Sequence, residues 1–208
     1  LESNIQKDGK IVTEEEYSKI KIDFELLVPG KHNILNAQAA IYTSILAGVS
    51  EVKAKEAIRT FRGTWRRLEY KGEKNNAIFY DDYAHHPTEI SASLSALQDK
   101  YPDRKIVCVF EPHQYSRTKL LFNDFVTSLK IADLCIIAPI FLSRENVDPT
   151  VSNKILAESI SEFIKASSVE NLQELKLKLD ELKEDKLCIV LMGAGDIYKW
   201  TSRLIEIT

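Results

Sequence analysis

Three uninterrupted apolar runs, separated by helical patterns, place the tightest limit on how this chain can fold. The runs are rich in β-branched residues and cover Lys105–Phe110, Leu134–Ile140 and Leu187–Met192. Continuous runs of this kind are typical of parallel strands that are buried on both faces of a sheet. Because helical patterns lie between the runs, strand and helix alternate along the chain. This order predicts an α/β fold with a doubly wound, mostly parallel sheet and right-handed crossovers.

Two shorter strands are expected before these runs, at Arg67–Lys71 and Ala77–Tyr80. Apolar residues recur at helical spacing in three stripes: Ile90, Leu94 and Leu97; Leu121, Phe125 and Leu129; and Leu172, Leu175, Leu179 and Leu182. The last stripe covers less than two heptads, so we expect it to pack against the core and not to form a coiled coil.

The first 60 residues follow a different pattern. Lys10–Phe24 is polar and irregular and favours a hairpin, and Val28–Lys31 reads as a turn. Helices are expected over Asn33–Gly48, with Gly48 at the end, and over Val52–Thr60. This segment holds too little strand for a sheet of its own, so we expect it to end a domain that begins upstream. Arg62–Thr64 is then the predicted hinge.

Composition excludes several classes of function. The net charge is −3 and the sequence pI is about 5.9, so the chain has no electrostatic footprint for nucleic acid. No apolar run approaches the roughly 20 residues that span a bilayer, and the first residues do not resemble a signal peptide. Cys108, Cys135 and Cys188 each lie inside an apolar run, which predicts buried free thiols in a reducing cytoplasm.

A cluster of titratable residues follows the second short strand, within the stretch Asp81–Glu89. Pro87 suits the first turn of a helix, so Asp82, His85 and His86 would lie beside a helix N-terminus. Open α/β sheets bind ligands at the carboxyl ends of their strands, and helix N-termini favour anions. The cluster therefore predicts a site. The alternative is that Asp82 only caps the loop and His86 only satisfies backbone groups.

Two further clusters follow the long apolar runs. After the first run, His113 and Arg117 stand four residues apart, and Arg117 could hold a carboxylate with two parallel hydrogen bonds or pair with a neighbouring surface residue. After the last run comes a glycine turn with Gly193 and Gly195. Its glycines could admit a ligand close to the backbone or simply make a tight turn, and Asp196 could cap the next helix.

Two clusters precede the sheet. Asn33 and Asn36 lie three apart at a helix start and could present amides to a base edge, although Asn33 could also be a simple N-cap. Arg66 and Arg67 at the predicted hinge could reach a phosphate or form a solvated edge. The sequence contains no Gly-x-x-x-x-Gly-Lys-Ser/Thr loop, so a phosphate cradle of that kind would lie outside this chain.

In order along the chain, five motifs resemble the C-terminal part of the Mur ligases. They are Pro29–Ala40, Arg66-Arg67-x-Glu69, Asp81–Glu89, Pro112–Thr118 and Met192–Ile197. The His-His-Pro-Thr-Glu and Pro-His-x-Tyr-Ser-Arg-Thr pieces are the specific ones, and they resemble the branch that joins L-alanine to UDP-N-acetylmuramate. The other pieces are shared more widely among Mur and folylpolyglutamate ligases.

The resemblance implies a three-domain enzyme that forms an amide bond at the expense of ATP, through an acyl phosphate, in peptidoglycan precursor synthesis. Residues 1–62 would end the central ATP-binding domain, and residues 63–208 would form the Rossmann-like domain that brings the amino acid. The phosphate loop and the ligands of the Mg²⁺ that accompanies ATP would lie outside this chain, so the chain alone should be inactive.

The resemblance also implies roles for single residues. Asn33 and Asn36 resemble the adenine contacts, Asp82 the acid that holds the ribose of ATP, and Arg67 the arginine that faces the phosphates. His85 or His86, with His113 and Arg117, would form the pocket for alanine and the reacting carboxyl group. Gln114 departs from the family pattern, in which many members have arginine. Arg117 would then grip the carboxylate alone, or alanine would bind more weakly.

Three alternatives remain at this point. Asp82, His85, His86, His113 and Asp196 are residue types that bind metals, which would suit a metal-dependent hydrolase, although no spacing among them fixes a metal geometry. A non-catalytic amino-acid-binding module could have kept the third domain alone. Within the ligases, the enzyme that recycles a tripeptide onto UDP-N-acetylmuramate has a similar Asp-x-x-His-His-Pro signature.

Overall fold

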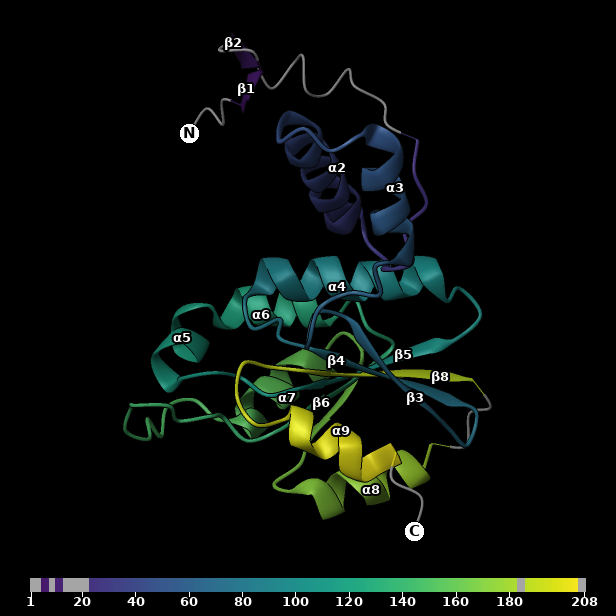
Figure 1. Cartoon of the computed structure of the whole chain (residues 1–208). Helices are drawn as coiled ribbons and strands as arrows, with labels where there is room; N and C mark the ends of the chain where they lie inside the picture. The colour runs from purple at the N-terminus through teal and green to yellow at the C-terminus, as the bar shows by residue number, and fades with distance from the viewer. Residues whose placement is uncertain (1–4, 8–9, 13–22, 183–185, 206–208) are drawn as a thin grey trace. The chain divides into compact units, whose positions relative to one another are not determined.

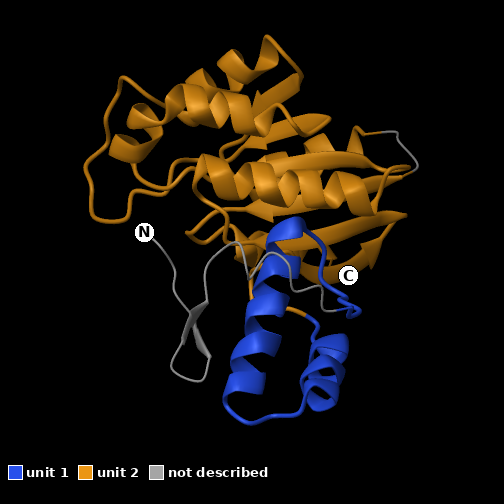
Figure 2. Ribbon diagram, turned by 90° about the horizontal axis from the view of Figure 1, so that it is seen from above, with its two compact units in different colours: residues 1–62 blue, residues 63–208 orange. Residues whose placement is uncertain are grey.

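The computed structural model describes residues 5–7, 10–12, 23–182 and 186–205. It divides the chain into two compact units, Leu1–Arg62 and Gly63–Thr208 (Figure 2). The boundary falls inside the segment predicted as a hinge. No helix in these described ranges is long and apolar enough to cross a membrane.

The smaller unit holds a short hairpin and two helices. Strands β1 (Ile5–Lys7) and β2 (Lys10–Val12) pair antiparallel, so the hairpin lies earlier than predicted, and residues 13–22 of the predicted range fall outside the described residues. Helix α2 (Lys31–Leu46) is followed by Gly48 at φ +89°, a conformation that favours glycine after a helix. Helix α3 (Glu51–Thr60) is capped by Ser50, whose hydroxyl accepts the Lys53 N–H.

The larger unit is built on one six-stranded sheet in the order β3-β4-β8-β5-β6-β7 (Figure 1). Its strands are β3 (Glu69–Lys74), β4 (Ala77–Asp82), β5 (Lys105–Phe110), β6 (Leu134–Ile137), β7 (Lys165–Ser168) and β8 (Leu187–Met192). Only the edge pair β3–β4 is antiparallel, and the other four pairs are parallel. The predicted α/β class with a mostly parallel sheet is confirmed.

Helices cover both faces of this sheet and enclose two apolar cores (Figure 1). On one face lie α4 (Pro87–Lys100), α6 (Phe122–Leu129) and α7 (Asn153–Ser161), and on the other lie α8 (Leu172–Asp180) and α9 (Tyr198–Ile205). The three predicted stripes all pack against these cores. All three cysteines are buried free thiols, as predicted. The two-sided arrangement is that of a doubly wound sheet.

The last strand of the chain lies in the middle of the sheet. β8 pairs with β4 on one side and β5 on the other, and Met192 is in register with both Asp82 and Phe110. Because all three strands are parallel, their carboxyl ends meet at one edge of the sheet. Every polar cluster that follows one of these strands is therefore brought to the same place.

Some predicted strands differ from the observed ones, because the apolar pattern of the sequence does not show where the backbone leaves the extended conformation. β3 begins at Glu69 instead of Arg67, because Arg66 and Leu68 adopt left-handed backbone angles with φ of 53° and 43°. β6 ends at Ile137 instead of Ile140, ahead of Pro139, which cannot donate to a ladder. β7, with the sequence Lys-Ala-Ser-Ser, was missed, since an edge strand this polar lacks an apolar signal.

Candidate functional site

The residues predicted from three separate motifs gather at the carboxyl ends of β4, β8 and β5. β4 ends in Asp82, and Gly193 and Glu111 directly follow β8 and β5. Backbone hydrogen bonds continue the register one step further: the Gly193 N–H donates to the Asp82 carbonyl over 3.1 Å, and the Glu111 N–H donates to the Met192 carbonyl over 2.8 Å. This edge is the position at which open α/β sheets bind ligands.

Asp82 presents a buried carboxylate at this edge, with only 3% of the residue exposed. Its Oδ1 accepts the Ala84 N–H over 3.2 Å, while Oδ2 is buried without a hydrogen-bond partner. Burial raises the pKa of Asp82 above its ordinary value. The loop-capping role considered for Asp82 is therefore real, yet it uses only one of the two oxygens.

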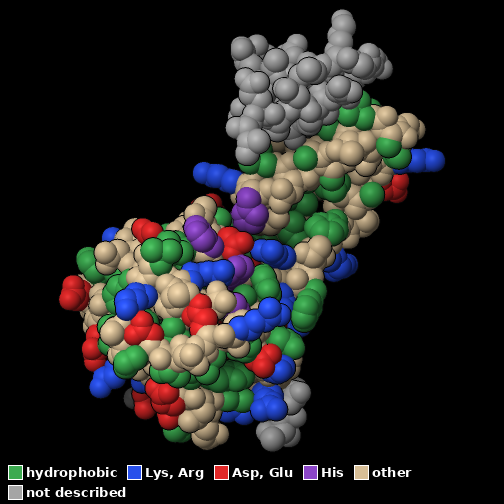
Figure 3. All heavy atoms as spheres, turned by 90° about the vertical axis from the view of Figure 1, so that its left-hand side faces the viewer, with side chains coloured by type: hydrophobic (Ala, Val, Ile, Leu, Met, Phe, Trp, Pro, Cys, Tyr) green, Lys and Arg blue, Asp and Glu red, His purple; other side chains and the backbone are tan. Residues whose placement is uncertain are grey.

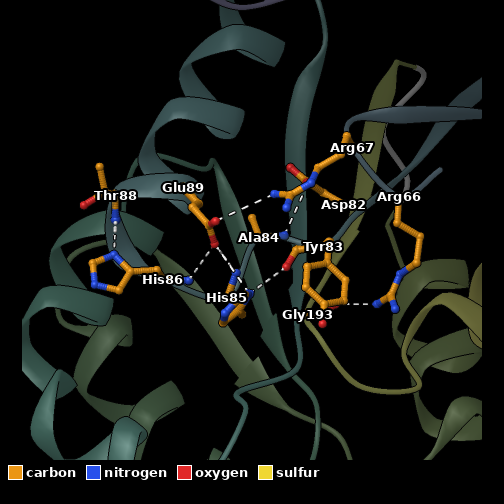
Figure 4. Close-up of polar contacts among 10 residues, drawn as sticks. All are labelled: Arg66, Arg67, Asp82, Tyr83, Ala84, His85, His86, Thr88, Glu89 and Gly193. Carbon is orange, nitrogen blue, oxygen red and sulfur yellow. Dashed lines mark hydrogen bonds and ion pairs between the residues drawn. The ribbon is translucent and has the colours of Figure 1, made fainter. Parts of the chain in front are cut away.

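His85 and His86 have different surroundings, as Figure 4 shows. His86 is exposed and caps α4: its Nδ1 accepts the Thr88 N–H over 3.3 Å, and Glu89 completes a capping box. The ring of His85 lies 6.2 Å from that of His113, between centroids. Its Nδ1 lies 3.0 Å from the Tyr83 carbonyl, which can only accept, and 3.5 Å from Glu89 Oε2, so Nδ1 carries a proton.

His113 and Arg117 lie on the loop and short helix that follow β5, the helix being α5 (Tyr115–Leu120). The Nδ1 atom of His113 is buried without a partner. Burial, with the nearby positive charge of Arg117, lowers the pKa of His113 below its ordinary value and keeps the ring neutral at pH 7. Among the described residues no carboxylate lies within ion-pair distance of Arg117, so the predicted alternative of a surface ion pair does not apply.

The two hinge arginines take opposite positions. Arg67 is exposed, lies over the ring of Tyr83 and, among the described residues, forms one long ion pair of 3.7 Å, with Glu89. Such an exposed pair contributes little stability and leaves the guanidinium free to bind a ligand. Arg66 is 3% exposed, and its guanidinium lies over Tyr83 and Tyr198. It is not the solvated edge that the sequence left open.

Arg66 and Glu111 secure the glycine turn between β8 and α9. The Nη2 of Arg66 donates to the Gly193 carbonyl, and its Nε is buried without a partner. Glu111 is buried, accepts the Ile197 N–H over 3.4 Å and has its pKa raised by burial to about 7. Asp196 contributes its backbone carbonyl to the Lys199 N–H, and its carboxylate pairs with the side chain of Lys199.

Asn33 and Asn36 belong to the smaller unit. Asn33 is not the N-cap that was considered, because α2 begins at Lys31 behind Gly30, and the Asn33 amide instead donates to the Pro29 carbonyl over 2.6 Å. Asn36 is exposed on the same helix. The amide spacing is therefore compatible with the predicted adenine contact, which stays a prediction.

Sequence reasoning did not single out the buried role of Arg66, the carboxylate of Glu111 or the ring of Phe141. Only the position of Glu111, first after a buried strand, could have signalled it.

In the larger unit three buried polar atoms have no partner among the described residues: Arg66 Nε, Asp82 Oδ2 and His113 Nδ1. Buried polar atoms are nearly always satisfied, so their clustering at one sheet edge indicates a place for a ligand. In Figure 3, histidine side chains are visible among the acidic and basic side chains that are spread over the face in view.

Comparison with known proteins decides the family. Residues 66–195, more than half of the chain, match the family described as Mur ligase, glutamate ligase domain. The chain belongs to the Mur ligase family. The residues that match the family in this Mur ligase chain include those at the edge of the sheet, from Arg66 through His113 to the glycine turn.

Individual relatives point to one branch of the family. The Mur ligase chain is 44% identical over 176 residues to a UDP-N-acetylmuramate–L-alanine ligase of Clostridium botulinum, covering 84% of this chain and 38% of that protein. Among solved structures it resembles UDP-N-acetylmuramate–alanine ligase MurC from Thermotoga maritima, with a TM-score of 0.74 and 28% identity over 94% of this chain and 41% of that one. A murein peptide ligase from Psychrobacter arcticus, at 23% identity and a TM-score of 0.61 over 88% of this chain and 38% of that one, shares the fold.

Proposed function

We propose that this chain is the C-terminal part of an ATP-dependent ligase that joins L-alanine to UDP-N-acetylmuramate in the cytoplasm. The chain spans only 38% of the length of the Clostridium botulinum relative, so the remaining machinery would come from preceding residues. One observation carries the proposal: His85, His113 and Arg117 lie with Asp82 at one edge of the sheet. The chain that places them there is 44% identical to a UDP-N-acetylmuramate–L-alanine ligase.

The pocket for alanine would lie between the loops after β4 and β5. Arg117 has a guanidinium free of protein carboxylates in the described part of the chain, so it can take the amino-acid carboxylate with two parallel hydrogen bonds. The attacking amine must be unprotonated. Neutral His113, beside the ring of His85, can orient the amine and receive its proton. We assign this role to His85 in preference to His86.

The nucleotide would meet Asp82 and Arg67. The unsatisfied Oδ2 of Asp82 is an acceptor suited to a ribose hydroxyl, and the exposed guanidinium of Arg67 suits a phosphate. Asn33 and Asn36 would supply amides to the adenine from the smaller unit, which we propose to be the end of the ATP-binding domain. Developing negative charge on the acyl phosphate is stabilised by fixed cationic groups of this kind.

The Mg²⁺ that accompanies ATP would be held elsewhere in the protein. Across the described ranges no three of the side chains His, Cys, Asp and Glu are grouped as they would be around a metal ion. Asp82 is influenced by the positive charge of Arg67 and fits a hydroxyl donor, so no step of the proposal depends on a metal ligand in this chain.

Phosphate release from ATP tests the proposal. It would be measured with UDP-N-acetylmuramate and L-alanine on this chain and on a form that carries the preceding residues of the protein. We expect release only from the longer form and only when both acceptor substrates are present. Release that requires a tripeptide in place of alanine would assign the chain to the recycling branch. No release from the longer form with any amino acceptor would favour a binding module.

A further inference from the structure

We propose that Phe141 is a positioning residue that fixes the ring of His113 in the amino-acid pocket, and that Gly195 makes the space in which Phe141 sits. The role of His113 in that pocket rests on the proposed function, whereas the placement of its ring by Phe141 does not. Phe141 comes from the segment after β6, and no motif in the sequence pointed to it.

The backbone joins the two residues directly. His113 and Phe141 form an isolated parallel bridge between the loops after β5 and β6. The Phe141 N–H donates to the Pro112 carbonyl over 2.8 Å, and the Phe141 carbonyl accepts the Gln114 N–H over 2.9 Å. His113 is therefore held on both sides by one residue of the neighbouring loop, in a segment where Gln114 has a left-handed φ of 71°.

The two rings are stacked. Their centroids are 5.4 Å apart, and the ring planes differ by 19°. The other neighbouring ring is that of His85, 6.2 Å away and tilted by 59°. The imidazole of His113 thus neighbours both rings, and the ring of Phe141 is the nearer and the more nearly parallel. Among the described residues no hydrogen bond to Nδ1 fixes the orientation of this ring, so its ring contacts must do so, and the stacked phenyl ring is the nearer of the two.

Gly195 explains why the phenyl ring can lie there. A Cβ at residue 195 would come within 2.6 Å of the Cγ and Cδ2 atoms of Phe141, which is closer than side-chain atoms pack, and it would also overlap the carboxylate of Glu111. The φ angle of Gly195 is not in the left-handed region, so backbone freedom does not require glycine there. The glycine turn serves to seat the ring of Phe141, which then holds His113.

Histidine NMR on this chain tests the placement without any catalysis. The chain has four histidines, and the variant His113→Gln would identify the signals of residue 113. In wild type we expect cross-relaxation between the rings of His113 and His85 and a lowered imidazole pKa at His113. Phe141→Leu keeps apolar bulk but removes the ring, so the cross-relaxation should fall and the pKa should rise towards its ordinary value. Phe141→Tyr keeps the stacked ring and should behave as wild type.

Gly195→Ala provides an independent variant, because it retains the phenyl ring but displaces it. It should reproduce the changes of Phe141→Leu. If Gly195→Ala does not fold, the comparison of Phe141→Leu with Phe141→Tyr still decides. Unchanged cross-relaxation and unchanged pKa in Phe141→Leu would overturn the proposal.

Kinetics on the longer form then separate the two proposals. Phe141→Leu should raise the KM for alanine about tenfold, leave the KM for ATP within about twofold, and be rescued by Phe141→Tyr, because a small displacement of a positioned group is costly. If the longer wild-type form does not ligate alanine, the proposed function fails while the NMR result still judges Phe141. If NMR shows a displaced His113 with unchanged kinetics, His113 is positioned but does not serve alanine.

Discussion

Arg117 and His113 carry the assignment of the loop after β5 to the amino acid. Arg117→Ala removes a two-pronged, charge-assisted contact, so we expect the KM for alanine in the longer form to rise roughly 10- to 100-fold, with a smaller change for ATP. Arg117→Lys keeps the charge but loses the fork geometry and should recover only part of the loss. His113→Ala should likewise affect alanine more than ATP. Equal losses for both substrates would remove this loop from the amino-acid pocket.

Asp82 should show opposite effects on stability and on nucleotide binding. Asp82→Asn retains an acceptor for the Ala84 N–H and removes a buried charge whose pKa burial raises. We therefore expect a higher free energy of unfolding at pH 8, measured by urea titration of this chain. In the longer form the KM for ATP should rise. A variant that is less stable and binds ATP as well as wild type would show that the carboxylate is structural.

At the scale of residues, the sequence could predict which motifs meet at one edge of the sheet but could not orient the side chains of this candidate site. The sequence alone cannot distinguish the roles of the adjacent residues His85 and His86. Because α4 begins at Pro87, His86 becomes the N-cap of that helix, and the ring of His85 lies near that of His113. Arg66 and Arg67 are equally alike. The left-handed backbone at Arg66 and the rings of Tyr83 and Tyr198 decide which of them is buried, and those rings come from distant segments.

Among the elements, α4 offers a direct test of the two histidines. His86 supplies the side-chain acceptor at the N-terminus of this helix. His86→Ala should lower the free energy of unfolding by about 1 kcal/mol, whereas asparagine, a preferred N-cap, should restore it. Because His86 is exposed and its Nδ1 is engaged at the start of α4, both variants should keep the turnover of the longer form. A loss of turnover in His86→Asn would return His86 to the catalytic set.

The elements that could be predicted from the sequence are those in which almost every residue is buried and therefore apolar. β5 and β8 have the bounds that were expected, because every residue after the first in β5, and every residue in β8, is buried. The polar edge strand β7 gave no such signal. β4 continues beyond its apolar part to Asp82, since its ladder with β8 extends to Met192. The sequence pattern assigns polar residues at the end of a strand to a loop, and the candidate site lies at such strand ends.

For the whole molecule, buried carboxylates predict how stability depends on pH. Burial raises the pKa of Glu111 to about 7 and that of Asp81 to about 6, so the folded chain holds protons that the unfolded chain releases. This stabilisation is complete below the ordinary pKa values, 4.5 for Glu111 and 3.8 for Asp81, and is lost as pH rises through 6 to 7. His113, with a lowered pKa, acts in the opposite direction.

The variant Glu111→Gln isolates the larger of these effects. Its free energy of unfolding should exceed that of wild type at pH 8, by up to ~3 kcal/mol, and the difference should shrink towards pH 5. Urea titrations across this range would measure the difference. A constant difference at all pH values would show that Glu111 does not titrate in the folded chain between pH 5 and 8.

The segment Arg62–Trp65, which contains the predicted hinge Arg62–Thr64, is the expected mobile point between the two units. Gly63 has a φ of 100°, a backbone angle that most residues avoid. We expect residues 1–60 and 66–208 of the longer form to change their relative placement between nucleotide-free and ATP-bound crystals. Identical placement in both states would contradict a hinge.

The position of β8 has a consequence for how the protein is made. Its six residues are translated after every other strand of this sheet, yet they fill the place between β4 and β5, so a ribosome must synthesise those other strands before the sheet can close. Until then β4 and β5 each present an unpaired edge, and open edges recruit strands from other chains. A premature stop shortly before Leu187 should therefore yield an aggregating polypeptide and not a weakened enzyme.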